Sequence, residues 1–388
     1  MFHIGIDIGS VTVKTVIFDT NNNIVYKEYK RHFSDVKKAL SEVLVNIYNK
    51  LKNSKVTIVI TGSGGIDISQ KLNIKFIQEV IASTHAIEYF YPETDVVIEL
   101  GGEDAKVTYL TGGIDQRMNG ICAGGTGAFI DQMASLLQTD TFGLNELAKD
   151  YNVIYPIASR CGVFAKTDIQ PLINDGAKRS DIAMSIFNAV VVQTVSVLSC
   201  GRKIEGKVAF LGGPLHFLPS LRDRFKSVLK LDDKDIIFPK DAQLYVAMGA
   251  SLLSKKEEAI KLDDLIKKIQ SLNIDDLNTT DKLDPLFKDE NDYNEFIKRH
   301  NKNTIKTCDI SKFNGNCFLG IDAGSTTTKA ALIDDKGNLL YTHYSSNEGK
   351  PLEVVIDIMN KIYNILPSNS KIVSSTVTGY GEGLIKKA

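Results

Sequence analysis

The residues with the clearest chemical potential stand near the N-terminus, in the run Asp7-Ile-Gly9-Ser10-Val11-Thr12-Val-Lys14. A β-rich run ends at a carboxylate, a glycine turn follows, and a lysine stands on the returning strand. Glycine lets a backbone approach a phosphate closely, and successive N–H groups in such a turn bind anions. Because a bare carboxylate repels a polyphosphate, we expect Asp7 to hold Mg²⁺ through water. An ordinary hairpin turn remains the alternative for this run alone.

Three further glycine turns strengthen the case. A second acidic hairpin reads Glu99-Leu-Gly101-Gly102-Glu103-Asp104-Ala-Lys106, and the other two turns are Leu211-Gly212-Gly213-Pro214 and Thr61-Gly62-Ser63-Gly64-Gly65. This order resembles the actin/sugar-kinase/Hsp70 superfamily, in which two phosphate hairpins face each other and a late glycine turn holds the adenosine. The resemblance implies ATP or ADP with Mg²⁺. Asp7 and one of Glu99 or Asp104 would hold the metal and orient the attacking water, and the residues leave that choice open.

Hairpins alternate with helical segments along residues 1–255. We expect strands at 2–8, 12–20, 24–29, 55–61, 95–100, 105–110 and 207–213, and helices at 33–52, 77–91, 127–137, 171 onward, 180–199 and 244–254. This pattern is typical of a mixed α/β fold and not of an all-parallel dinucleotide-binding sheet. With the superfamily resemblance, it predicts an actin-like (ribonuclease H-like) ATPase fold with duplicated subdomains and a cleft between them.

The N-terminal motif occurs twice. Residues 317–344 align without gaps to residues 2–29, and ITGSGG at 60–65 matches VTGYGE at 377–382. We predict a complete module at 1–255, with subdomain I at about 1–92 plus 243–255 and subdomain II at about 93–242. Residues 256–316 would form a charged helical linker, or a partly disordered tether. Residues 317–388 would be the N-terminal part of a second module, so we interpret the chain as part of a longer protein.

Composition excludes several classes of partner. The formal net charge is −1, which offers no electrostatic case for nucleic acid or an anionic membrane. No apolar run reaches the length of a membrane span, and the N-terminus does not resemble a signal peptide. We therefore expect a cytoplasmic protein. The five cysteines are widely spaced, which favours buried thiols, metal ligands or redox sites over disulfides.

Two cysteines stand in unusual runs. Cys122 lies in Met118–Met133 and Cys161 in Ser159–Asp168, each just before an expected helix start, where partial positive charge favours the thiolate. Thiolates bind iron–sulfur clusters, and two modules would together supply the four that a cluster needs. Burial as ordinary small residues is the alternative for both, and burial inside an apolar helix is the expectation for Cys200.

These runs resemble the ATPase activators of 2-hydroxyacyl-CoA dehydratases and the benzoyl-CoA reductase ATPase subunits (the BadF/BadG/BcrA/BcrD type). The matching segments are Asn119–Ile130, Cys161–Ala165, Gly101–Lys106 and Thr84–Ala86. The tandem arrangement resembles the large fused activase-like proteins of anaerobes.

The resemblance implies a homodimer or paired modules sharing one [4Fe–4S] cluster, with Cys122 and Cys161 as the ligands from each half. ATP would drive an electron from a ferredoxin or flavodoxin to a CoA-thioester dehydratase or reductase. The expected nucleotide contacts are Gly9, Ser10, Val11, Thr12, Lys14, Gly101, Gly102, Glu103, Gly124, Thr126, Gly127, Gly212, Gly213 and Pro214.

Two departures from the family pattern matter. Glu99 and Glu103 stand where the family often has aspartate and glutamine, and Pro214-Leu-His216 differs from the single-module activators. We expect the longer Glu99 side chain to shift Mg²⁺ or slow hydrolysis. A sugar-type small-molecule kinase of the same fold, or a non-catalytic nucleotide-binding regulatory module, stays open as an alternative.

Overall fold

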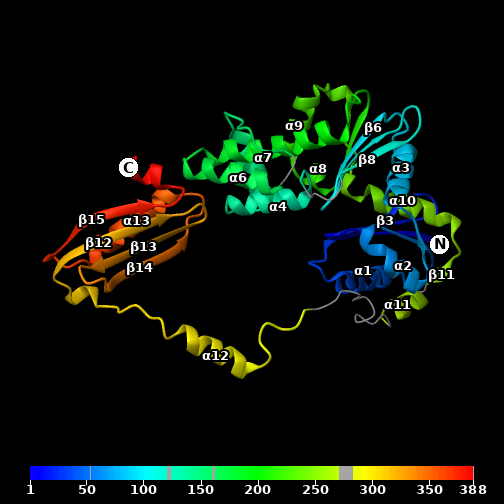
Figure 1. Cartoon of the computed structure of the whole chain (residues 1–388). Helices are drawn as coiled ribbons and strands as arrows, with labels where there is room; N and C mark the ends of the chain where they lie inside the picture. Colours follow the sequence, from blue (N-terminus) through cyan, green and yellow to red (C-terminus); the bar gives the residue numbers. More distant parts are fainter. Residues whose placement is uncertain (53, 120–123, 160–161, 271–282, 388) are drawn as a thin grey trace. The chain divides into compact units, whose positions relative to one another are not determined.

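A computed structural model describes residues 1–52, 54–119, 124–159, 162–270 and 283–387 (Figure 1). The chain divides into two compact units. The first comprises residues 1–134, 140–165 and 183–279, and the second comprises residues 135–139, 166–182 and 280–388. Cys122 and Cys161 lie outside the described residues.

The first unit contains a six-stranded sheet in the order β11-β4-β1-β2-β3, with β5 paired to β4. Its strands are β1 (Phe2–Ile8), β2 (Thr12–Phe18), β3 (Ile24–Arg31), β4 (Lys55–Thr61), β5 (Lys75–Phe76) and β11 (Ile260–Lys261). The three N-terminal strands are antiparallel, and β4 lies parallel to β1. Both β1 and β4 are rich in β-branched residues and almost wholly buried, as expected for central strands covered on both faces.

Helices cover both faces of this sheet. One face packs against α1 (Val36–Leu51), α2 (Ile66–Leu72) and α11 (Leu262–Gln270), in a core that includes Leu262 and Leu265. The other face packs against α3 (Glu79–Phe90) and α10 (Tyr245–Leu253). Gly5 permits the close approach of α10, because a Cβ at that position would lie 2.1 Å from the Ala247 carbonyl oxygen.

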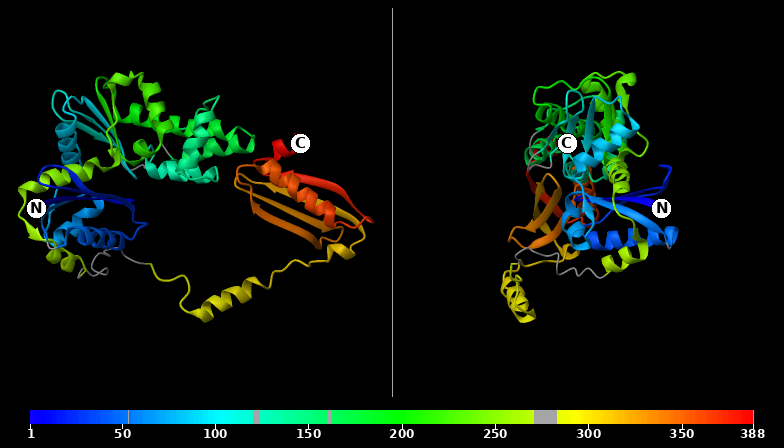
Figure 2. Two further views of the ribbon diagram at one scale, coloured as in Figure 1. Left: turned by 180° about the vertical axis from the view of Figure 1, so that it is seen from behind. Right: turned by 90° about the vertical axis from the view of Figure 1, so that its right-hand side faces the viewer.

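A second sheet in the first unit has the order β10-β9-β6-β7-β8. Its strands are β6 (Val96–Leu100), β7 (Ala105–Tyr109), β8 (Asp115–Met118), β9 (Val208–Leu211) and β10 (Ile236–Ile237). Three further helices of this unit are α5 (Thr141–Leu147), α8 (Gly213–Phe217) and α9 (Pro219–Leu229). Helices α4 (Gly127–Leu136), α6 (Gly162–Asn174) and α7 (Arg179–Gln193) have residues in both units. Val97 and Leu211 share one core with α3 and α10, so these two helices lie between the two sheets (Figures 1 and 2).

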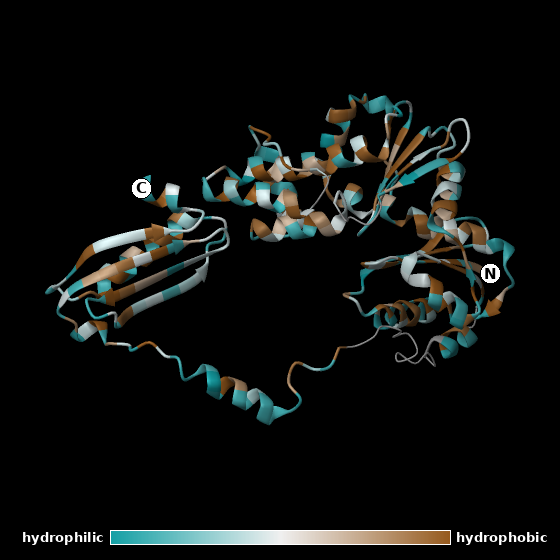
Figure 3. Ribbon diagram, in the orientation of Figure 1, coloured by the Kyte–Doolittle hydropathy of each residue, from teal (hydrophilic) through white to brown (hydrophobic). Residues whose placement is uncertain are grey.

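The second unit contains a four-stranded sheet in the order β14-β13-β12-β15. Its elements are β12 (Gly315–Ala323), β13 (Thr327–Asp334), β14 (Leu339–Ser346), α13 (Pro351–Ile365), β15 (Ser370–Thr378) and α14 (Glu382–Lys387), preceded by α12 (Glu290–His300). Hydrophobic residues mark the strands of all three sheets, whereas α12 is largely hydrophilic (Figure 3). The register repeats that of the first sheet, since Asp322 faces Lys329 as Asp7 faces Lys14.

All three sheets share one pattern of three antiparallel strands with a fourth lying parallel to the first. This pattern confirms the mixed α/β prediction. Several elements were missed in the sequence, among them β8, α2, α5, α8 and α9. Helix α6 begins at Gly162, with Pro171 inside the helix and not at its start. The predicted module boundary at 255 is too early, because β11 pairs with β4 and α11 joins the core of the first sheet.

The prediction that Cys200 is buried is wrong, because it lies exposed just beyond the apolar helix.

One helical stretch, Arg179–Leu198, is long and apolar enough to cross a membrane, but 72% of it is buried inside the protein, as in the core helix of a globular domain.

Candidate functional site

The first acidic turn joins β1 to β2. The Gly9 amide donates to the Thr12 carbonyl oxygen over 2.9 Å, which closes the turn. Asp7 is the second-last residue of β1 and is 2% exposed, and its Oδ2 lies 2.6 Å from Lys14 Nζ on β2. Burial lowers the pKa of Lys14, but Asp7 outweighs it, so that the pKa is raised overall and the lysine stays charged.

The second acidic turn joins β6 to β7 in the same way. Lys106, only 5% exposed, lies 2.7 Å from Asp104 and 3.8 Å from Glu99, and it also pairs with Glu79 of α3. Burial raises the pKa of Glu99, although Lys106 opposes the effect and a hydrogen bond from Ser83 over 2.9 Å also lowers it. Glu99 is therefore a desolvated carboxyl group that contacts both Lys106 and Ser83.

The two turns face each other across the first unit. A Cβ at Gly102 would lie 2.7 Å from Val11 Cγ2 and 4.0 Å from Ser10 Oγ, so that the turns approach because Gly102 has no side chain. Two strand-joining glycine turns thus lie side by side, and glycine turns of this kind are a common place for anion binding.

A cavity of about 330 Å³ opens beside the turns, within the range of small-molecule sites. Its lining includes ten of the predicted site residues: Val11, Thr12, Lys14, Glu99, Gly101, Gly102, Gly127, Gly212, Gly213 and Pro214. The glycine turn Leu211–Pro214, called the third glycine turn below, forms another wall of the cavity. Its Gly212 has a φ of +90°, and a Cβ there would lie 2.0 Å from the Leu100 carbonyl oxygen. Residues from four predicted motifs are therefore brought to one cavity.

Seven predicted residues do not line this cavity: Asp7, Gly9, Ser10, Glu103, Asp104, Gly124 and Thr126. The first five belong to the two acidic turns, where Asp104 faces Lys106 and Glu103 is exposed. A Cβ at Gly124 would lie 2.7 Å from the Gln193 side chain, and Thr126 is fully buried. The expectation that Gly124 and Thr126 reach the nucleotide therefore finds no support in their positions.

Asp7 fits a magnesium ion held through water. Its Oδ2 is paired with Lys14, whereas its Oδ1 is buried and has no hydrogen-bond partner among the described residues. The same part of the chain has no group of three or more His, Cys, Asp or Glu side chains suited to hold a metal directly. A hard cation here would therefore take most of its oxygen ligands from phosphate and water, as Mg²⁺ often does.

Helix α4 begins at the second acidic turn. The Gly127 and Ala128 amides donate to the Gly101 and Gly102 carbonyl oxygens, over 3.0 and 2.7 Å. Gly127 thus touches the cavity, but its N–H is already used. The start of α6 packs nearby, since a Cβ at Gly162 would lie 3.4 Å from the Phe129 ring. The helices that follow the two cysteine-bearing runs therefore meet beside the cavity.

The sequence pattern of the BadF/BadG/BcrA/BcrD ATPase family matches residues 4–254, more than half of the chain. The chain belongs to this family. The matched residues include both acidic turns, the third glycine turn and α10, so the BadF/BadG/BcrA/BcrD match spans all the motifs that meet at the cavity.

Several relatives of this chain are named as activator proteins. The 2-hydroxyisocaproyl-CoA dehydratase activator of Clostridioides difficile is 30% identical over 263 residues, which cover 66% of this chain and 96% of that protein. The solved structure of the Clostridium difficile activator with bound ADPNP has a TM-score of 0.58 and 27% identity, and covers 72% of this chain and all of that one. Component A of Acidaminococcus fermentans (R)-2-hydroxyglutaryl-CoA dehydratase has a TM-score of 0.58 and 27% identity, covering 66% and 98%. These two structures show the actin-like ATPase fold for this chain.

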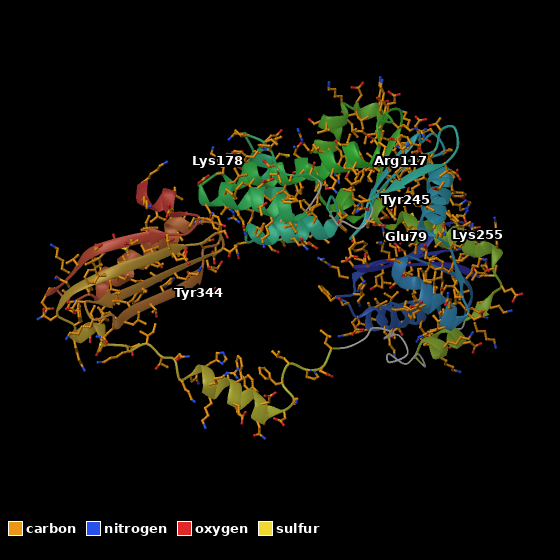
Figure 4. All side chains as sticks on the ribbon, in the orientation of Figure 1. Glu79, Arg117, Lys178, Tyr245, Lys255 and Tyr344 are labelled. Carbon is orange, nitrogen blue, oxygen red and sulfur yellow. The ribbon has the colours of Figure 1, made fainter. Side chains whose placement is uncertain are left out.

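Several residues in and near the cavity were missed in the sequence. Arg31 of β3 pairs over 2.7 Å with Asp131 of α4, and both line the cavity. Glu79 of α3 pairs with Lys106 and accepts from the Ser63 amide over 3.2 Å, so it joins two glycine turns. Glu79 and Tyr245, on the two middle helices, lie between the sheets (Figure 4). The acidic first turn of a helix that directly follows glycine turns was the available signal for Glu79.

Proposed function

We propose that this chain is an ATP-dependent activator that passes a low-potential electron to a CoA-thioester dehydratase or reductase. The observation that carries the proposal is the direct hydrogen bonding of α4 to the second acidic turn. This contact gives the nucleotide site a route to the helix that follows Cys122. Membership of the BadF/BadG/BcrA/BcrD ATPases supports the proposal, as do relatives named as dehydratase activators.

In this proposal the cavity binds ATP with its phosphates at the two acidic turns. Backbone amides and the Lys14 ammonium would neutralise phosphate charge, and Asp7 would hold Mg²⁺ through water. Magnesium, when bound, bridges phosphate oxygens and neutralises developing charge. Glu99 lines the cavity and Asp104 does not, so we assign to Glu99 the orientation of the attacking water.

Hydrolysis changes what the second acidic turn contacts. Loss of the γ-phosphate removes ligand contacts from Gly101 and Gly102, whose carbonyl oxygens hold the first amides of α4. A small shift of this turn would therefore tilt α4, which is a hinge motion driven by γ-phosphate contacts.

The electron path in the proposal uses Cys122 and Cys161. Their thiolates would supply two ligands of a [4Fe–4S] cluster, and a second module or a second chain would supply the other two. One electron enters from a ferredoxin or flavodoxin and one leaves to the acceptor enzyme, while ATP and water give ADP and phosphate.

The proposal is tested by anaerobic purification, with iron and sulfide assays and the visible spectrum. We expect about two irons per chain, following thiolate ligation of a cluster shared by two modules. Cys122→Ala should lose them, whereas Cys200→Ala, which changes an exposed cysteine elsewhere, should keep them. No iron after reconstitution, in a protein that still binds ATP, would contradict the electron-transfer role and turn attention to phosphorylation of a small molecule.

A further inference from the structure

Gln243 is a polar side chain at the cavity that neither the ATPase match nor the two acidic turns explain. It stands in the short 3-10 turn Ala242–Leu244 and lines the cavity. Its Oε1 atom is buried and has no hydrogen-bond partner among the described residues. A buried carbonyl oxygen without a partner costs free energy, so an apolar side chain of equal size would serve a packing role better.

Gln243 is fixed beside the third glycine turn. The Gly212 amide donates to the Ala242 carbonyl oxygen over 3.1 Å, which joins the two backbones directly. A Cβ on Gly213 would lie 2.7 Å from the Tyr29 hydroxyl, so β3 also closes on this turn. Gln243 thus stands at the end of the cavity formed by the third glycine turn and not at the two acidic turns.

Aromatic rings line the same end. Phe217 of α8 packs edge-on against Tyr29, with ring centroids 5.5 Å apart, and against Phe142 of α5, at 6.1 Å. Phe142 is 56% exposed and Phe217 is 37% exposed, so that both present ring surface beyond their mutual contact. Exposed aromatic surface beside the Gln243 amide suits a flat heterocycle, because a heterocycle stacks on aromatic rings and its edge can hydrogen-bond to the amide.

We propose that Gln243 selects a 6-aminopurine nucleotide at this cavity, and the inference rests on the nucleotide binding proposed above. A carboxamide offers one acceptor and one donor side by side, which match the 6-amino group and N7 of adenine. A 6-oxopurine presents two acceptors at these positions, so that one of them faces the Gln243 carbonyl oxygen whichever way the amide is turned. The substrate is therefore ATP, and ITP or GTP is rejected.

The test compares ATP with ITP, which carries an oxygen at the purine 6-position and a proton on N1, by displacement of a fluorescent ribose-labelled ADP in the presence of Mg²⁺. The full chain should bind ATP on the order of tenfold more tightly than ITP, as one well-formed base contact provides. Gln243→Met, which keeps the size and removes the amide, should bring the ATP-to-ITP ratio close to one. Gln243→Lys, which only donates, should favour ITP.

The ratio within each variant separates recognition from folding, because a loss of stability weakens both ligands alike. Gln70→Met, an exposed site on α2, is the matched control and should keep the wild-type ratio. Equal binding of ATP and ITP by the wild-type chain, or an unchanged ratio in Gln243→Met, would overturn the assignment while nucleotide binding stands. Absence of any labelled-ADP binding would overturn the proposed nucleotide site as well.

Discussion

At the residue scale, both acidic turns hold a carboxylate and a lysine as a buried pair. Asp7 with Lys14, and Glu99 with Lys106, occupy matching positions on their hairpins, and each pair faces across neighbouring strands. Removing one partner of a buried pair leaves the other charge uncompensated, which is strongly destabilising. Each lysine therefore offsets part of the electrostatic cost of burying the carboxylate that it faces.

Glu99→Gln should separate hydrolysis from binding. The amide keeps the size of the side chain but cannot take up a proton from the attacking water, so we expect kcat for ATP hydrolysis to fall about hundredfold, as for loss of a general base. ADP affinity should change only a few-fold. Steady-state hydrolysis and ADP titration measure the two effects, with Glu88→Gln, an exposed position on α3, as the control. Unchanged hydrolysis in Glu99→Gln would return the role to Asp104.

The pH dependence of hydrolysis should report the environment of Glu99. Burial raises the pKa of this carboxyl group above its ordinary 4.5, and the group must be ionised to orient water, so activity should fall on acidification at a higher pH than for an exposed glutamate. The hydrogen bond from Ser83 lowers the pKa, so Ser83→Ala should move the acidic limb of the kcat profile upward. A limb that stays in place, or moves downward, would contradict this assignment.

Residue types alone predicted much of the site. The glycines, Asp7, Lys14 and the second acidic turn were all identifiable, because phosphate binding needs those residue types in that order. The choice between Glu99 and Asp104 was not, because it depends on which side of the β6–β7 hairpin each carboxylate faces. Gln243 was missed for a similar reason, since only the packing of its turn against Gly212 brings it to the cavity.

At the element scale, the contact between the two acidic turns depends on one missing side chain. Gly102→Ala should push the turns apart, because the new methyl group would lie 2.7 Å from Val11 Cγ2. We expect a loss of stability of about 1–3 kcal/mol, as for overpacking of a close contact, together with weaker ADP binding. Thermal unfolding and ADP titration measure both.

Val11→Ala supplies the control for this clash, because it removes the atom that the new methyl group meets. The double variant Gly102→Ala/Val11→Ala should recover most of the stability and affinity lost in Gly102→Ala. A double variant no better than the sum of the two single changes would show that the turns do not touch through this contact.

Elements with a strong hydrophobic pattern were predictable, and those fixed by neighbours were not. The strands of the first sheet are short apolar runs bounded by turn residues, which is a local signal. Helix α6 was placed too late because proline favours the first turn of a helix, whereas Pro171 here lies inside one. The helix α11 was read as part of a linker because its charged exposed face concealed Leu262 and Leu265, which only the first sheet buries.

At the scale of the whole molecule, the two copies of the N-terminal hairpin differ in what covers them. Gly5 of the first copy lies against α10, whereas a Cβ at its counterpart Gly320 would meet only the Ala331 carbonyl oxygen, at 3.9 Å. Asp322 also pairs with Lys329, over 2.9 Å, but its side chain is 42% exposed, compared with 2% for Asp7. Among the residues that the structure describes, the carboxylate of this motif is therefore buried in the first copy and partly exposed in the second.

Substitution by alanine at the two equivalent glycines should therefore change the free energy of unfolding by very different amounts. Gly5→Ala places a methyl group against the backbone of α10, and we expect a loss of about 3 kcal/mol or no folded protein, since backbone cannot move aside as a flexible side chain can. Gly320→Ala should change the free energy of unfolding by no more than about 0.5 kcal/mol. Denaturant unfolding of both variants decides the matter, and equal effects would contradict the structural difference between the copies.

The packing of α10 against β1 also limits when β1 can be covered during synthesis. Ser251 of α10 donates to the His3 carbonyl oxygen across 248 positions of sequence. Strand β1 is therefore made long before α10, the helix that covers one of its faces. Until then Val16 and Phe18 stay open to solvent or to other nascent chains, and contacts this distant in sequence form slowly. The first half of this ATPase should depend on chaperones for as long as its second half is being made.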